Sequence, residues 1–115
     1  MSTELGTPAT ATNQRLLSPR VEGFLVALRE RLPLLQSDYG VQALWLYGSF
    51  VRGEEGPASD LDLLVEFDDR PLSLLKFIEL EHRLSDWLSV PVDLVEKKTL
   101  KSVIGRYILK EIVAV

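Results

Sequence analysis

The sequence contains no cysteine and only one histidine among its 115 residues. The absence of cysteine excludes disulfides and thiolate metal sites. The single histidine, His82, lies in a charged segment typical of a solvent-exposed helix face, so we expect a surface residue rather than a metal ligand. Neither a thiol nor a cluster of imidazoles is therefore available as the centre of a site.

Positive charge is also in short supply. The formal net charge is −4, whereas independent binding to nucleic acid requires a concentrated positive surface, so we expect no such binding. No run of about twenty apolar residues is present to span a membrane, and the N-terminus lacks the charged start and apolar middle of a signal peptide. We therefore expect a cytoplasmic protein with no membrane partner.

The composition fits a single folded domain. Hydrophobic residues make up 46% of the sequence and the mean hydropathy is +0.09, which favours a globular chain with one ordinary core. Residues 1–17 are rich in Thr, Ala, Ser and Gly and show no periodic apolar pattern. We expect a flexible N-terminal tail over residues 1–17 and one domain over residues 18–115.

The first predicted helix begins at Ser18-Pro19, where a capping serine precedes a proline in the first helical position. Apolar residues follow at helical spacing, so one face should pack on a core. Pro33 cannot donate a backbone N–H, and we expect the helix to end or kink there, with a turn at residues 37–40.

The remaining chain alternates between short apolar runs and helical patterns. The expected elements are strands at 41–47, 61–67 and 91–95, a short helix from Ser49, a loop at 52–59, a turn at 68–71, a helix at 72–88 and a final helix capped by Thr99 whose apolar face reaches Ile112. This order predicts an α/β (α+β) domain with helices packed on a small sheet. Whether the strands run parallel or antiparallel stays open.

A Gly-Ser pair follows the first predicted strand. Gly48 lets the backbone turn sharply and lets a phosphate approach without a Cβ in the way. Ser49, at the start of a helix, adds a hydroxyl and free N–H groups. The same pair is ordinary in a plain strand-to-helix turn, so on its own it predicts phosphate binding only weakly.

Two aspartates begin the second predicted strand. Asp60 and Asp62 are two residues apart, so their side chains share one face with Cα atoms about 6.5–7 Å apart. Both carboxylates can then approach one Mg²⁺, a hard cation that takes one or two carboxylates together with phosphate oxygens and water. The alternative is that Asp60 caps the turn and Asp62 is solvated.

A third aspartate interrupts the last predicted strand. Asp93 lies in an otherwise apolar run, where burial of a carboxylate is costly unless it is paired or bound to a metal. If this strand lies beside the Asp62 strand, three carboxylates meet on one face and can hold two cations about 3.5–4 Å apart. Asp93 would then act as general base or as a metal ligand. The alternative is an ion pair with Lys97 or Lys98.

The combination of Gly48-Ser49, Asp60-Leu61-Asp62 and the later strand aspartate resembles the signature of the DNA polymerase β-like nucleotidyltransferases. With Gly53, Pro57 and Ser59 in place, the pattern is similar to the minimal nucleotidyltransferases. The likeness runs from about Val41 to the C-terminus, including the closing segment Tyr107–Glu111.

The resemblance implies a small mixed sheet flanked by helices and a set of site residues. Gly48 and Ser49 would hold a nucleoside triphosphate, Arg52 would remain as the nearby cation, and Asp60, Asp62 and Asp93 would bind Mg²⁺, as two ions. The family transfers a nucleoside monophosphate, here AMP from ATP, to a hydroxyl. Members of this size often act as antitoxins beside a HEPN toxin, and some attach AMP to it, so a homo- or hetero-oligomer is an expected state.

One position departs from the family pattern. The residue after Ser49 is often arginine in the relatives and is Phe50 here, so nucleotide binding should be weakened without being abolished. Two other functions stay open: an antitoxin that neutralises its partner by binding alone, and nucleotidyl transfer to a small molecule. The three aspartates favour catalysis, and the lack of an acceptor-binding domain disfavours a small-molecule acceptor.

Overall fold

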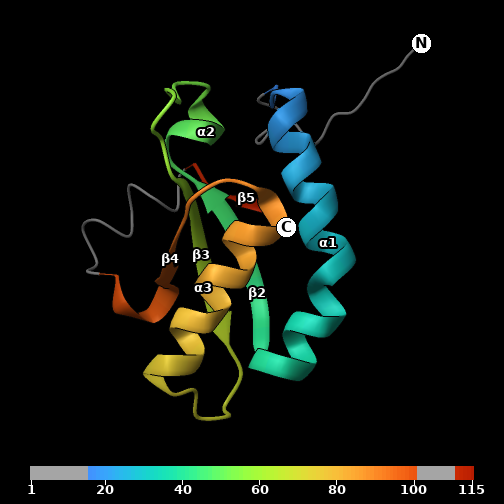
Figure 1. Ribbon diagram of the computed structural model, residues 1–115, viewed down its shortest axis with the longest axis vertical. Helices are drawn as coiled ribbons and strands as arrows, with labels where there is room; N and C mark the ends of the chain where they lie inside the picture. Colours follow the sequence, from blue (N-terminus) through green and yellow to red (C-terminus); the bar gives the residue numbers. More distant parts are fainter. Residues whose placement is uncertain (1–15, 101–110) are drawn as a thin grey trace.

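The computed structural model describes residues 16–100 and 111–115, and its strands form one sheet with helices packed against it (Figure 1). The elements in chain order are α1 (Pro19–Tyr39), β2 (Val41–Tyr47), α2 (Ser49–Arg52), β3 (Leu61–Phe67), α3 (Leu74–Leu88), β4 (Val92–Glu96), a 3₁₀ turn η2 (Lys97–Thr99) and β5 (Val113–Ala114). The three predicted strands are present, each within one residue of its expected bounds. The short strand β5 was not predicted.

The sheet has the strand order β4-β3-β2-β5. Strand β2 runs antiparallel to both β3 and β5, whereas β3 and β4 run parallel. A parallel pair needs a crossover connection, and α3 supplies it. The sheet is therefore mixed, which settles the orientation that the sequence left open and confirms the α/β class.

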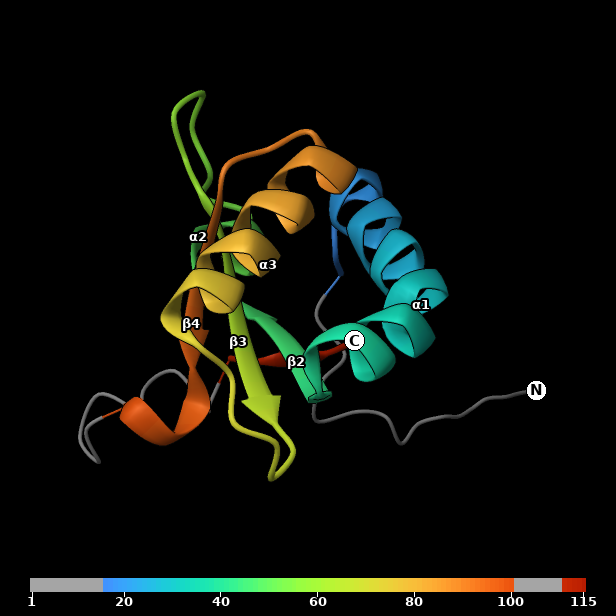
Figure 2. The same cartoon turned by 60° about the horizontal axis from the view of Figure 1, so that its bottom comes forward.

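The helices α1 and α3 lie on the same face of the sheet and enclose the core (Figure 2). Strand β3 alternates accordingly: Leu61, Leu63 and Val65 are fully buried in this core, while Asp62 lies on the opposite face. Burial of a leucine or valine side chain contributes about 1.5–3 kcal/mol. A slip of one residue would exchange the two faces, so the apolar residues determine where Asp62 points.

Helix α1 runs through Pro33 to Tyr39, so of the two expected outcomes, an end or a kink, an end at this proline is wrong. Leu35 and Tyr39, beyond the proline, are buried in the core, and their packing outweighs the loss of one backbone hydrogen bond. The helix ends instead at Gly40, whose left-handed backbone (φ 72°) lets its N–H bond to Gln36 O at 3.0 Å. The predicted turn at 37–40 is thus mainly helical.

Two sequence predictions concern the ends of the chain. The tail lies almost wholly outside the described residues, as does most of the final helix. Thr99 closes η2, with its hydroxyl donating to Glu96 O at 2.8 Å, and Ile112 precedes β5 rather than ending a helix. None of the described helices has the length and apolar character that a membrane crossing demands.

Side chains of α3 bind the backbone of β4. The Ser85 hydroxyl accepts the Val92 N–H at 3.0 Å, and the Glu81 carboxylate accepts the Leu94 N–H at 2.9 Å. Val92 and Leu94 are themselves buried in the core. These contacts fix β4 relative to α3 and hold Asp93, which lies between the two bonded residues, at a defined place on the sheet.

Candidate functional site

The parallel pairing of β3 and β4 brings two of the predicted aspartates side by side. Asp62 and Asp93 are direct partners in the register, so their side chains lie on one face of neighbouring strands. Asp60 is exposed and immediately precedes β3, two residues before Asp62. All three predicted aspartates therefore lie at one end of the sheet, where β3 and β4 begin, on the face away from α1 and α3. We call this group of aspartates the carboxylate edge.

The reason given for Asp93 needs correction. The residue is exposed rather than buried, because β4 alternates and only Val92 and Leu94 face the core. The alternative ion pair is not formed either: Lys98 bonds to Glu96 at 3.4 Å, and Lys97 lies over the ring of Trp45. Within the described residues, Asp93 is thus a solvent-facing carboxylate beside Asp62.

Electrostatic repulsion marks this group of carboxylates. Partial burial, together with the negative charges of Asp93 and Asp60, raises the pKa of Asp62 to about 6. Arg52 opposes the rise but does not cancel it. A cation bound between these carboxylates would relieve the repulsion and lower the pKa of Asp62 again.

Tyr47 borders the same group, since it is the partner of Asp62 on the neighbouring strand β2. Burial raises the pKa of Tyr47 to about 12, with further contributions from Asp62, Asp93 and Glu111. The phenol therefore stays protonated at every pH at which the protein would work. It can donate a hydrogen bond at this edge of the sheet but carries no charge there.

Glycine is required at position 48 by the backbone conformation and by the adjacent Asp62 side chain. Its φ of 84° lies in the region that favours glycine, and a Cβ at this position would lie 2.1 Å from Asp62 Oδ2. The turn thus passes directly against the Asp62 carboxylate. This contact joins the two halves of the predicted site, the Gly-Ser turn and the aspartates.

Ser49 and Arg52 are the two ends of the short helix α2. The Ser49 side chain is half-buried, and the backbone carbonyl of Ser49 accepts the Glu54 N–H at 2.8 Å. The Arg52 guanidinium donates from Nε to Glu54 at 3.0 Å and from Nη1 to both oxygens of Glu111, at 3.0 and 3.1 Å. The cation predicted to bind phosphate is thus held by two carboxylates.

Glu111 is the site residue that sequence reasoning missed. Besides Arg52, its carboxylate accepts the Gly48 N–H at 3.0 Å. The sequence placed Glu111 in the closing segment and gave it no role, although it is the last charged residue before four apolar ones. That pattern was the available signal, but only the fold shows that this segment returns to the Gly-Ser turn.

Phe50, which replaces the common arginine, belongs to the core. It is 2% exposed, its ring meets that of Phe24 edge-on with centroids 5.7 Å apart, and the Arg20 guanidinium lies 5.1 Å from its centroid. The position therefore anchors α2 against α1 and does not face the carboxylates. The Phe50 side chain therefore contributes packing to the core.

The described residues contain no ready-made metal cage, since no three carboxylate, histidine or cysteine side chains among residues 16–100 and 111–115 converge as ligands. The donor set still suits Mg²⁺, which takes one or two protein carboxylates and completes its shell with phosphate oxygens and water. Asp62 and Asp93 supply such a pair. Soft or imidazole-binding metals find no ligands in this group of residues.

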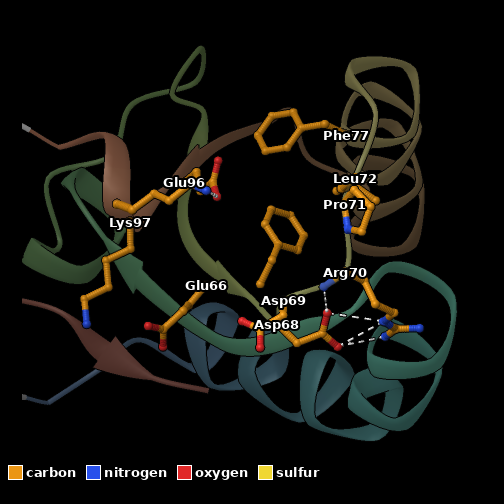
Figure 3. A pocket seen from close by; sticks show the side chains of 11 residues that line it. Glu66, Asp68, Asp69, Arg70, Pro71, Leu72, Phe77, Glu96 and Lys97 are labelled. Carbon is orange, nitrogen blue, oxygen red and sulfur yellow. Dashed lines mark hydrogen bonds and ion pairs between the residues drawn. The ribbon is translucent and has the colours of Figure 1, made fainter.

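A pocket of about 770 Å³ lies at the opposite end of β3 and contains none of these residues (Figure 3). Its lining comprises residues 66–72, Phe77 and residues 96–98. The rings of Phe67 and Phe77 meet edge-on, and the charged groups around them include both signs. Two ion pairs, Asp68–Arg70 and Glu96–Lys98, neutralise part of this charge, and none of the predicted site residues lines the pocket, so we place the chemistry at the carboxylate edge.

Comparison with known proteins agrees with this geometry. The nucleotidyltransferase domain family matches residues 28–115. Protein adenylyltransferase MntA of Thermococcus cleftensis is 45% identical over 95 residues, which cover 83% of this chain and 92% of that protein. The range of the family match spans the Gly48 turn, Asp60, Asp62, Asp93 and strand β5.

Solved structures show the same fold. A structure provisionally assigned as a minimal nucleotidyltransferase superposes with a TM-score of 0.67 at 33% identity, covering 81% of this chain and 94% of that one. The complex of a tri-AMPylated Shewanella oneidensis HEPN toxin with MNT antitoxin superposes with a TM-score of 0.52 at 21% identity, covering 83% and 67%. The chain therefore belongs to the nucleotidyltransferase domain family, has the polymerase β-like fold expected from its motif, and is a nucleotidyltransferase of the minimal type.

Proposed function

We propose that this nucleotidyltransferase moves AMP from ATP to a hydroxyl group of a protein, and that the acceptor is a HEPN-type toxin for which it is the antitoxin. The name of its Thermococcus relative, protein adenylyltransferase, supports AMP as the group and a protein as the acceptor. The likeness to an MNT antitoxin bound to a tri-AMPylated HEPN toxin supports the class of partner.

The observation that carries the proposal is the direct pairing of Asp62 with Asp93 beside Gly48. It combines two carboxylates that repel each other with a turn whose backbone approaches them without a side chain. Asp60, Asp62 and Asp93 are the residues that would hold Mg²⁺, which supplies neutralisation of the triphosphate and favours ionisation of the acceptor hydroxyl. Gly48, Ser49 and Arg52 would bind the triphosphate.

The reaction joins the acceptor oxygen to the α-phosphorus and breaks the bond from that phosphorus to the bridging oxygen, so pyrophosphate leaves. Asp93 is exposed and belongs to the carboxylate edge, where it can accept the proton of the incoming hydroxyl. The turn from Gly48 to Arg52 orients the leaving phosphates. Orientation and charge stabilisation therefore provide most of the rate, as is usual for phosphoryl chemistry.

Transfer of label from α-labelled ATP tests this function directly. The protein is incubated with ATP, Mg²⁺ and a HEPN protein as candidate partner, sought first in the neighbouring gene, and label on the partner is followed by gel and by mass spectrometry. Asp62→Asn should reduce the transfer rate by about 10³-fold, because it removes a charge that the bound cation needs. Glu66→Gln is the matched control, since it removes a carboxylate from the same strand and face at the pocket end.

Neutralisation by binding alone makes the opposite prediction. In that case Asp62→Asn would suppress the toxin as well as the wild-type protein does, and no label would appear on the partner. Equal transfer by the Asp62→Asn and Glu66→Gln variants would also contradict the role assigned to the carboxylate edge.

A further inference from the structure

We propose that Glu111 is a positioning residue of the phosphate-binding turn, acting on the triphosphate through Arg52. The inference rests on the proposed function, because it assumes that the turn from Gly48 to Arg52 binds ATP. It adds a residue that lies far from the motif in sequence and assigns a task to the C-terminal strand.

One carboxylate joins both ends of α2. Glu111 Oε1 accepts the Gly48 N–H at 3.0 Å, and both Glu111 oxygens accept from Arg52 Nη1, at 3.0 and 3.1 Å. Gly48 precedes the helix and Arg52 ends it. A helix of four residues is not stable by itself in water, so α2 depends on contacts outside the helix. The buried Phe50 and Val51 hold its middle, and the Glu111 carboxylate ties its two ends together.

The carboxylate is itself well anchored. Glu111 lies two residues before β5, whose Val113 and Ala114 pair with Leu46 and Trp45 of β2. The chain is held again at Val115, whose N–H bonds to Leu44 O at 3.0 Å. The C-terminal segment therefore fixes Glu111 on the same strand, β2, that delivers Gly48 to the site.

Arg52 has a second carboxylate partner that serves as an internal comparison. Glu54 bonds to Nε at 3.0 Å, but its side chain is 65% exposed, whereas that of Glu111 is 19% exposed. Both pairs lie at the surface, where water screens them, but the Glu111 carboxylate is the less exposed partner and accepts from Nη1 through both of its oxygens. We therefore assign to Glu111, rather than to Glu54, the larger part in holding the direction of the guanidinium.

This arrangement leaves Arg52 able to bind an anion. The guanidinium has five N–H donors, and within the described residues its bonds use Nε and Nη1 but not Nη2. A guanidinium held before the ligand arrives loses little side-chain entropy on binding. Loss of Glu111 should therefore weaken ATP binding and leave the chemical step nearly unchanged, since Glu111 does not touch the reacting atoms.

The binding test uses the full chain with Mg²⁺ and ATP in titration calorimetry, together with steady-state transfer to the partner. Glu111→Gln should raise the Kd and KM for ATP about tenfold with kcat within about twofold, because it removes the charge that holds Arg52. Glu54→Gln, which alters the exposed partner of the same guanidinium, should change Kd by less than about twofold. Glu111→Asp keeps the charge and should recover part of the affinity.

A double substitution separates positioning from a general structural effect. In an Arg52→Gln background, Glu111→Gln should have no further effect on Kd, because the group through which it acts is gone. Additive effects, or a Kd that Glu111→Gln leaves unchanged or lowers, would overturn the proposal; a lowered Kd would mean that Glu111 competes with the triphosphate. Thermal unfolding of each variant checks folding, and Glu111→Asp carries the test if Glu111→Gln does not fold.

The same experiment distinguishes failure of the inference from failure of the function. If the wild-type protein binds ATP and labels its partner while Glu111→Gln behaves identically, only the positioning role is wrong. If the wild-type protein neither binds ATP nor transfers label, the phosphate-binding turn is wrong and the role of Glu111 falls with it.

Discussion

Both ends of strand β3 carry clustered charges, but oppositely charged groups form ion pairs at one end, whereas like charges lie together at the other. At the pocket end, Asp68 bonds to Arg70 at 3.0 Å and Glu96 to Lys98 at 3.4 Å, and the Arg70 guanidinium lowers the pKa of Asp68. At the other end, burial and its acidic neighbours raise the pKa of Asp62 to about 6. Oppositely charged groups satisfy one another within the fold, whereas clustered like charges are typical of ligand-binding sites, which is why we assign the proposed function to the Asp62 end.

Two glycines test this comparison most strongly, since each has a positive φ and lies against an aspartate at one end of β2. A Cβ on Gly48 would lie 2.1 Å from Asp62 Oδ2, and one on Gly40 would lie 2.6 Å from Asp68 Oδ1. Both alanine substitutions should lower the free energy of unfolding by about 1–2 kcal/mol, because both force a non-glycine residue to positive φ. Only Gly48→Ala should also lower AMP transfer, by about 100-fold, because it displaces a carboxylate of the site.

Chemical denaturation and label transfer on the two glycine variants give the two readouts. Equal loss of activity in Gly40→Ala and Gly48→Ala would mean that general destabilisation, rather than displacement of Asp62, explains the result. Retention of full activity by Gly48→Ala would remove the turn from the site.

The pH dependence of transfer should follow Asp62. Its carboxylate must be ionised to hold a cation, so with limiting Mg²⁺ we expect kcat/KM to fall about tenfold per pH unit below about 6 and to level off above that value. Raising the Mg²⁺ concentration should move the midpoint to lower pH, because the cation competes with the proton. A midpoint that does not respond to Mg²⁺ would contradict the assignment of Asp62 as a ligand.

The smallest expected effect is on stability, and its sign differs between the two ends. Asp62 ionises near 3.8 when unfolded and near 6 when folded, so the folded state loses stability as pH rises from about 4 to 6, and the penalty is complete above that range. Asp62→Asn should therefore raise the free energy of unfolding at pH 7 without Mg²⁺, by about 1 kcal/mol after allowance for solvent screening.

Asp68→Asn should instead lower the free energy of unfolding at pH 7. The pKa of Asp68 is lowered by Arg70, so its ionised form stabilises the fold above the unfolded pKa, and this contribution is lost as pH falls. Thermal unfolding at pH 7 and pH 4 compares the two variants. Destabilisation by Asp62→Asn at pH 7 would show that its carboxylate is already compensated in the ligand-free protein.

The strands and the aspartates could be predicted from sequence because their signals are local. Apolar runs bounded by turns identify β2, β3 and β4, and the two-residue period places Asp60 and Asp62 on one face. The motif then predicted the fold. The end of α1 predicted at Pro33 is wrong, because Leu35 and Tyr39 are buried by contacts with distant elements that a local rule does not include.

Glu111 could not be found in the same way. Its role depends on β5 pairing with β2, which lies more than sixty residues earlier in the chain, and a two-residue strand leaves almost no pattern. Asp93 shows that a local pattern can also mislead. Its apolar neighbours suggested burial on both faces, whereas the alternation of β4 leaves it exposed, so the reason for choosing Asp93 was wrong while its place beside Asp62 was predicted.

The contacts of α3 with β4 limit how a second protein can attach. Strand β4 forms one side of the sheet, where free N–H groups would normally invite an extended peptide to add a further strand. Glu81 and Ser85 already occupy the N–H groups of Leu94 and Val92. A partner that presents its hydroxyl at Asp93 must therefore be recognised through side chains rather than by strand addition along β4, and the same closure protects this edge from self-association.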